Sequence, residues 1–216
     1  MLALAGAAVA LTALLTAPVA HAQDAAAGQA KAAQCIGCHG IAGYQASFPE
    51  VYKVPRISGQ NAKYIAASLT AYRKGERKHP TMRSVAVAMT DADIADLAAF
   101  YEGHGASSLK TVSAGPAQPP AAVAALLAKG ACASCHGADF NKPIDGAYPK
   151  LAGQHADYLY ASLRSYATEG NPNMGRANAI MGAQVKPFKR TELKAMADYI
   201  ASLPGDVRTV PQSRFK

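Results

Sequence analysis

All four cysteines of this 216-residue chain fall in two short strings of the form Cys-x-x-Cys-His. Within one helical turn, two such thiols can each add to a vinyl group of the same porphyrin, and the histidine then lies under its iron as an axial ligand. The pattern therefore predicts two covalently attached c-type haems. The residues concerned are Cys35, Cys38 and His39 in the first string and Cys132, Cys135 and His136 in the second.

Three other uses of paired cysteines have to be weighed against haem attachment. An even number of cysteines in an exported protein could form disulfides, and a Cys-x-x-Cys pair could be a redox dithiol or half of a zinc site. A dithiol of the thioredoxin type needs a βαβ context, and the sequence shows no strand pattern. A zinc ribbon does not explain a histidine directly after the second cysteine in both strings. Haem attachment explains the histidine in both strings and uses every cysteine.

The two strings belong to a longer internal repeat. Residues 55–60 (Pro-Arg-Ile-Ser-Gly-Gln) match residues 149–154 (Pro-Lys-Leu-Ala-Gly-Gln), and Met82 matches Met181. A repeat of this length indicates two copies of one structural unit. We expect a first domain over 23–104 and a second over 121–207. Between them, residues 105–120 are rich in Gly, Ser and Pro, as is typical of a linker, and 208–216 form a C-terminal tail.

Helical periodicity dominates both units, so we expect an all-α fold. In the first unit the sequence predicts helices over 24–34 and 60–73, and a third between an N-cap at Thr90 and Gly103. In the second unit it predicts helices over 121–131 and 155–167, and a third that starts at an N-cap at Thr191 and stops at 203–205. Domains this small have little apolar core, and we expect each to depend on its haem for folding.

The first 20 residues contain no charged side chain. Ala20-His21-Ala22 follows them and fits the small-x-small rule for signal peptidase, so residues 1–22 are interpreted as a secretory signal cleaved after Ala22. The basic residue that usually precedes such a segment is missing. A retained membrane anchor is the alternative, since about 20 apolar residues can span a bilayer, but Pro18 and the cleavage site favour removal. Either interpretation puts the globular part outside the cytoplasm, in the periplasm.

The formal net charge is +8, with hydrophobic residues at 50% and charged residues at 17%. That composition is typical of a globular protein and excludes a wholly disordered chain. The basic residues are spread out rather than gathered in a stripe with a reading element, so nothing predicts nucleic-acid binding. Diffuse positive charge favours an acidic protein partner, or reflects solubility alone.

The second axial position decides between electron transfer and substrate chemistry. A methionine thioether opposite the histidine gives an iron with raised potential and no open position, whereas an empty face admits oxygen or peroxide. Met82 and Met181 are the candidates, because each lies in an expected loop with Pro, Gly or Asn before the last helix of its unit, at the same place in the repeat. Met174 is a rival in the second unit, while Met196 and Met89 are interpreted as core residues.

Other residues of the repeat have candidate roles beside the haems. The carbonyl of Pro55 or Pro149 could accept the Nδ1 proton of the proximal histidine and fix its tautomer, with Pro49 as the competitor in the first unit. Four tyrosines could pack on haem or hydrogen-bond its propionates, or simply fill the core: Tyr64, Tyr72, Tyr158 and Tyr166. The remaining histidines of the mature chain are interpreted as surface or capping residues: His79, His104 and His155.

Taken together, the two haem motifs, the repeated Gly-Gln-x-x-x-Tyr segments, the two methionines and the signal resemble dihaem cytochrome c4 over residues 25–205. The resemblance implies two class I cytochrome c folds related by a pseudo-twofold axis. It also implies a periplasmic electron carrier whose partners are terminal oxidases or related respiratory proteins, often at the membrane face. By that resemblance His39 and Met82 ligate the first iron, and His136 and Met181 the second. One departure is Ala125, which stands where the first unit has Gly28.

Three functions fit these features. The leading hypothesis is a redox carrier that is not an enzyme and passes single electrons through two haems. The second is the electron-transfer subunit of a periplasmic dehydrogenase whose catalytic cofactor lies on another chain. The third is a dihaem peroxidase, which needs one haem with an accessible face and is disfavoured by the two methionines.

Overall fold

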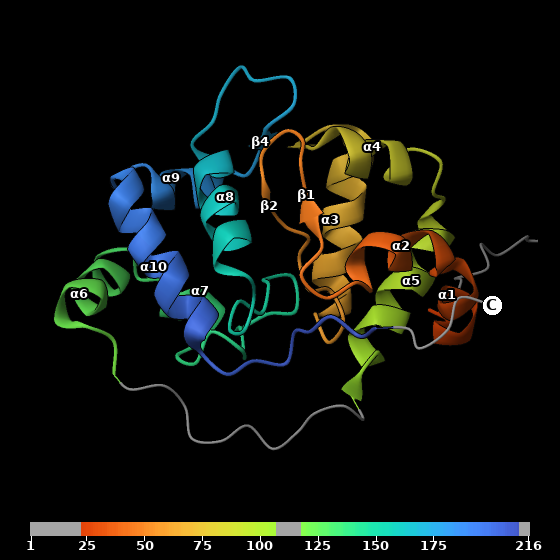
Figure 1. Ribbon diagram of the computed structural model, residues 1–216, viewed down its shortest axis with the longest axis horizontal. Helices are drawn as coiled ribbons and strands as arrows, with labels where there is room; N and C mark the ends of the chain where they lie inside the picture. The colour runs from red at the N-terminus through yellow and green to blue at the C-terminus, as the bar shows by residue number, and fades with distance from the viewer. Residues whose placement is uncertain (1–22, 107–117, 212–216) are drawn as a thin grey trace, which may run out of the picture.

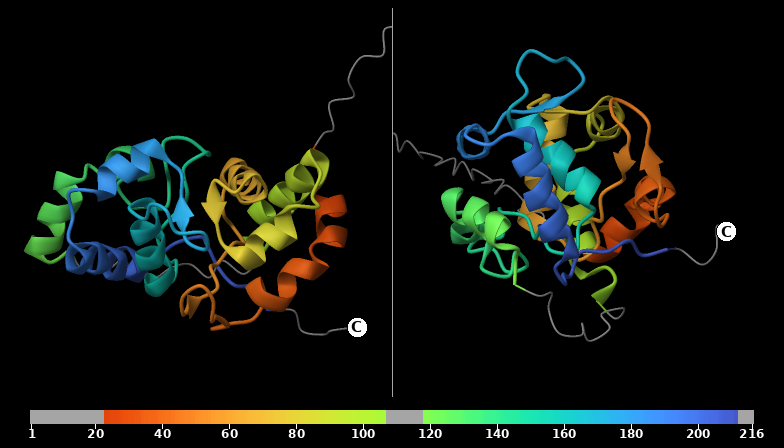
Figure 2. Two further views of the ribbon diagram at one scale, coloured as in Figure 1. Left: turned by 90° about the horizontal axis from the view of Figure 1, so that it is seen from above. Right: turned by 60° about the vertical axis from the view of Figure 1, so that its left-hand side comes forward.

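The structure is a computed structural model that describes residues 23–106 and 118–211. Two helical units lie side by side, one in red to yellow-green and one in green to blue (Figure 1), and the views from above and from the side agree (Figure 2). The expected signal segment, most of the expected linker and the end of the tail lie outside the described residues. In the described part of the chain no helix is long and apolar enough to cross a membrane.

The all-α expectation is confirmed, with short strands that the sequence did not predict. The first unit contains α1 (Ala25–Lys31), α2 (Ala33–His39), β1 (Gln45–Ala46), β2 (Tyr52–Lys53), α3 (Ala62–Lys74), β3 (Arg77–Lys78), α4 (Pro80–Ala86) and α5 (Asp91–Gly103). The second contains α6 (Ala121–Lys129), α7 (Ala133–His136), α8 (Ala156–Tyr166), β4 (Gly175–Arg176), α9 (Ala179–Val185) and α10 (Arg190–Ser202). Each strand has two residues, so helices build both cores.

The helix starts are partly as expected. Thr90 caps α5: its hydroxyl accepts from the Asp93 N–H at 3.1 Å, and the Asp93 carboxylate accepts from the Thr90 N–H at 2.9 Å. This capping box satisfies two amides that the helix leaves free. Thr191 as the cap of the last helix is wrong. The N-cap is Lys189, whose backbone N–H donates to Glu192 Oε2 at 2.7 Å, so the helix begins one residue before Thr191.

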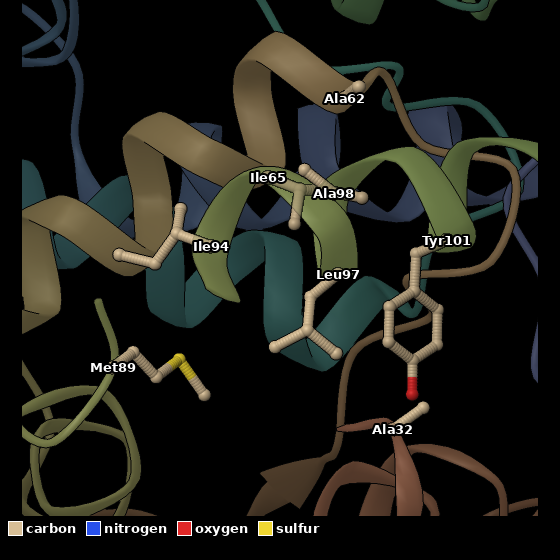
Figure 3. Close-up of a cluster of buried hydrophobic side chains, with 8 residues drawn as sticks. All are labelled: Ala32, Ala62, Ile65, Met89, Ile94, Leu97, Ala98 and Tyr101. Carbon is tan, nitrogen blue, oxygen red and sulfur yellow. The ribbon is translucent and has the colours of Figure 1, made fainter. Parts of the chain in front are cut away.

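The core of the first unit forms where α3 crosses α5. Figure 3 shows Ile65 of α3 against Leu97 and Ala98 of α5, with the Tyr101 hydroxyl pointing toward Ala32. Met89 is buried in the same cluster, as expected for a core methionine. In the second unit, α8 and α10 pack around Leu159, Ala197 and Ile200, and Met196 lies in an adjoining cluster.

Gly28 allows α1 to lie directly on α5. A Cβ at this position would overlap the backbone carbonyl of Asp96 and come within 2.8 Å of the Phe100 Cβ. Neither neighbour can move without shifting α5. We therefore expect Gly28→Ala to destabilise the protein by about 1–3 kcal/mol, the usual cost of overpacking, as measured by urea unfolding. Gly103→Ala is the matched control because a Cβ there would have no atom within 4 Å; it leaves stability unchanged or slightly raised. Equal losses in both variants would contradict the packing argument.

The two units share an interface built from equivalent segments. Strands β3 and β4 pair antiparallel, with Arg77 opposite Arg176. The chain after α10 then crosses to the first unit, where the Arg208 N–H donates to the Ser58 carbonyl at 2.9 Å and the Arg208 guanidinium donates to the Gly105 carbonyl at 3.1 Å. The start of the expected tail thus contacts the first unit (Figure 1).

Candidate functional site

One cavity of about 490 Å³ runs through both units. Its walls are mostly apolar and come from the two haem motifs, the tyrosines of α3 and α8, and the short helices α4 and α9. All eight residues that the sequence singles out line it: Cys35, Cys38, His39, Met82, Cys132, Cys135, His136 and Met181. Residues about a hundred positions apart in the chain therefore meet around a single space.

Each motif histidine is oriented by a proline carbonyl. His39 Nδ1 lies 2.8 Å from the Pro55 oxygen, and His136 Nδ1 lies 3.2 Å from the Pro149 oxygen. A carbonyl only accepts, so Nδ1 carries the proton and Nε2 keeps its lone pair. The expected role of Pro55 and Pro149 as hydrogen-bond acceptors is confirmed, and Pro49 is not the partner. Desolvation lowers the pKa of both imidazoles, against an opposing effect of the proline bonds. The neutral form that binds metals is thus favoured.

No disulfide joins any two of the four cysteines, all of which lie in the described part of the chain. Cys35 and Cys38 lie on α2. Cys132 is the N-cap of α7, and Cys135 lies within that helix. Desolvation raises the pKa of Cys35 and Cys132, as expected for thiols that face an apolar cavity. Within residues 23–106 and 118–211 no three His, Cys, Asp or Glu side chains converge on a metal-sized site.

The methionines lie on short helices, and not in the loops that the sequence suggested. Met82 is in α4, and its N–H donates to His79 Nδ1 at 3.3 Å; Met181 is in α9, and its N–H donates to Asn178 Oδ1 at 2.9 Å. His79 is thus a helix cap whose repeat partner is Asn178, an equivalence that the sequence comparison missed. Met174 makes its backbone hydrogen bond to Asn171 Oδ1 and does not line the cavity.

Two arginines complete the site, and sequence reasoning missed both. Tyr158 Oη accepts from the Arg77 guanidinium at 2.7 Å and from that of Arg176 at 3.2 Å, and Arg176 also donates to Ser162 Oγ at 2.6 Å. Arg77 is only 8% exposed. The repeat in the sequence does indicate them, because each arginine stands five residues before a candidate methionine.

These arginines have the character of an anion site. Within the described part of the chain neither forms a salt bridge with a carboxylate: the ion pairs found there involve other residues. The Nε of Arg77 is buried without a hydrogen-bond partner. Burial opposes ionisation of Tyr158, but the two guanidiniums outweigh it and lower its pKa. Since uncompensated buried cations cost several kcal/mol, carboxylates such as haem propionates suit this position, and the cavity fits haem.

Comparison with known proteins agrees with this geometry. The family described as Cytochrome c matches residues 25–103 and 121–204. A cytochrome c4 of Azotobacter vinelandii is 33% identical over 201 residues, covering 86% of this chain and 92% of the relative. The chain belongs to the dihaem cytochrome c4 family. The solved cytochrome c4 of Acidithiobacillus ferrooxidans is 28% identical with a TM-score of 0.59, and the match covers 80% of this chain and 99% of that one.

One relative of this cytochrome c4 carries a different description. A "thiosulfate dehydrogenase electron acceptor" of Stutzerimonas stutzeri is 30% identical over 177 residues, covering 78% of each chain. The expected fold of two tandem cytochrome c domains is confirmed, as are two covalent c-type haems and a role in electron transfer.

Proposed function

We propose that this cytochrome c4 carries single electrons between redox proteins outside the cytoplasm. In this proposal Cys35 and Cys38 attach the first haem and Cys132 and Cys135 the second. The axial ligands are His39 and Met82 for the first iron, and His136 and Met181 for the second. The observation that supports it is the common cavity, which these eight side chains share across the two units.

The residues of the chain hold each site in one geometry. When bound, each haem supplies an iron that alternates between ferric and ferrous, so a donor protein loses one electron and an acceptor gains it. Pro55 and Pro149 hold Nδ1 of each histidine, which leaves Nε2 for the iron, and the caps at His79 and Asn178 fix the methionine backbones. A histidine and a methionine would together hold each iron and would leave no position for a substrate. The chain therefore acts as a carrier and not as an enzyme.

The shared cavity also supports transfer within the chain. Tyr64 and Tyr72 of the first unit and Tyr158 and Tyr166 of the second line the same space. A space that both units line lets an electron enter through one unit and leave through the other. Excess positive charge, +3 over 23–110 and +5 over 111–216, steers the protein toward acidic donors and acceptors.

A second candidate function is that of acceptor for a periplasmic dehydrogenase, as the Stutzerimonas stutzeri relative suggests. A free carrier makes short, salt-sensitive encounters, whereas a subunit stays in a stable complex. Gel filtration of a native extract distinguishes them. Elution at the size of the single chain supports the carrier, and co-elution with dehydrogenase activity at physiological salt supports the subunit.

Optical spectroscopy tests the ligand assignment. The pyridine haemochrome assay on protein made in a host with haem-maturation machinery should give two c-type haems per chain. The ferric spectrum should contain the weak far-red band of methionine sulfur on low-spin iron, unchanged by cyanide or peroxide at low concentration. A high-spin ferric signal that shifts when peroxide is added would contradict the carrier assignment for that haem and favour a peroxidase.

A further inference from the structure

Two buried glutamines each reach from one unit into the other. Gln60 and Gln154 are only 4% and 5% exposed, and they occupy equivalent positions in the repeat. Gln154 Oε1 accepts from the Arg56 N–H at 2.9 Å, and its Nε2 donates to the Arg56 carbonyl at 2.8 Å. Gln60 makes the same pair of bonds to the backbone of Lys150, each at 2.9 Å. The exchange is reciprocal, as a twofold arrangement of the units requires.

A further bond locks each amide in this orientation. Gln154 Oε1 also accepts from the His155 N–H at 3.0 Å, and Gln60 Oε1 accepts from the Asn61 N–H at 3.0 Å. Each oxygen thus faces two donors while each nitrogen faces a carbonyl. This pattern shows which amide atom is oxygen and which is nitrogen. Both polar atoms of each side chain take part in hydrogen bonds, so the residues do more than fill space.

The peptide bonds that the glutamines contact are those that orient the motif histidines. The Arg56 N–H and the Pro55 carbonyl belong to one peptide unit, whose oxygen lies 2.8 Å from His39 Nδ1. The Lys150 N–H and the Pro149 carbonyl form the equivalent unit for His136, at 3.2 Å. When a peptide N–H donates, its carbonyl oxygen becomes a stronger acceptor, because hydrogen bonds in a chain polarise one another by about 10–30%.

We infer that Gln154 is a positioning residue for His39 and that Gln60 is one for His136, so that each unit adjusts the axial histidine of the other. A stronger bond at Nδ1 raises the electron density of the imidazole and favours ferric iron. The inference rests on the proposed ligation by these histidines. It makes the interface part of each redox centre, in addition to joining the two units.

The substitutions Gln154→Met and Gln60→Met test this crossed arrangement. Methionine keeps an unbranched side chain of similar volume but offers no amide to the backbone. In Gln154→Met we expect the ferrous-to-ferric ratio of the first haem to rise about threefold at fixed ambient potential, because the Pro55 oxygen becomes a weaker acceptor. This change equals about 28 mV at 59 mV per tenfold. The second haem stays unchanged. Gln60→Met gives the reverse pattern.

Nuclear magnetic resonance of the reduced protein gives an independent measure. The Nδ1 proton of His39 should move upfield in Gln154→Met, while that of His136 stays in place. Gln154→Glu keeps an acceptor for the Arg56 N–H and leaves the His39 proton unmoved or downfield, which provides a test if the methionine variant does not fold. Asn61→Ala is the matched control: it removes an interdomain bond from Nδ2 to the Tyr148 carbonyl (3.0 Å) without touching the peptide behind His39.

The outcomes separate this inference from the proposed function. Crossed shifts in the glutamine variants, with no shift of the first haem in Asn61→Ala, support it. Parallel shifts of both haems in every variant would mean a general loosening of the interface and would overturn it, as would the absence of any shift. Wild-type protein without two methionine-ligated haems would instead contradict the ligation on which it rests.

Discussion

Replacing Met82 by alanine is expected to lower the potential of the first haem by about 0.1–0.3 V, a sizeable part of the roughly 0.8 V that axial ligands span. A thioether favours ferrous iron, and alanine leaves that face open to water or hydroxide. The far-red ferric band should fall to about half its strength while the haem count stays at two. Met181→Ala should do the same to the second haem, and the double variant should lose the band entirely. Spectroelectrochemical titration measures both quantities.

Met174→Ala is the control for the second unit. Its side chain does not line the cavity, so both potentials and the full band should persist. If Met174→Ala abolishes half of the band and Met181→Ala does not, the ligand assignment of the second iron is wrong. Binding of cyanide to Met82→Ala, but not to the wild type, would show directly that the sixth position has been opened.

The sequence predicted those parts of the site that depend on local spacing. Haem attachment needs two thiols and a histidine within about one helical turn, and the motif contains all three. Thr90 was recognisable as a cap because its partner Asp93 lies three residues away. The methionines were found through the repeat, although their short helices were not: each helix has seven residues, and periodicity cannot be recognised over two turns.

Contacts between the units could not be predicted in this way. Arg77 and Arg176 resemble ordinary surface charges in the sequence, because nothing local shows that β3 and β4 pair across the interface. Gln60 and Gln154 were visible as repeated residues, but their partners lie 90 residues or more away in the chain. Lys189 is not a common cap, so propensity favours Thr191, whereas the side chain of Glu192 determines the start of α10.

Removing the attachment cysteines of the first unit, Cys35→Ala with Cys38→Ala, should leave one c-type haem per chain and unfold that unit. In the proposed assignment both haems occupy the cavity of about 490 Å³. Emptying half of it costs at most about 6 kcal/mol, at about 24 cal/mol per Å³. That is comparable with the whole stability of a small domain, about 5–15 kcal/mol. The charge of Arg77 also remains buried without an anion, which adds to the loss.

Haemochrome stoichiometry and thermal unfolding followed by far-ultraviolet circular dichroism measure this effect. The double variant should lose helix signal at ambient temperature and retain a single transition from the second unit. Cys132→Ala with Cys135→Ala is the mirror control and should spare the first unit. Because the Gln60 and Gln154 bonds join the units, the surviving transition should lie below that of the wild type. A double variant that keeps full helix content and unfolds at the temperature of the wild type would show that the first unit folds without its haem and would contradict this prediction.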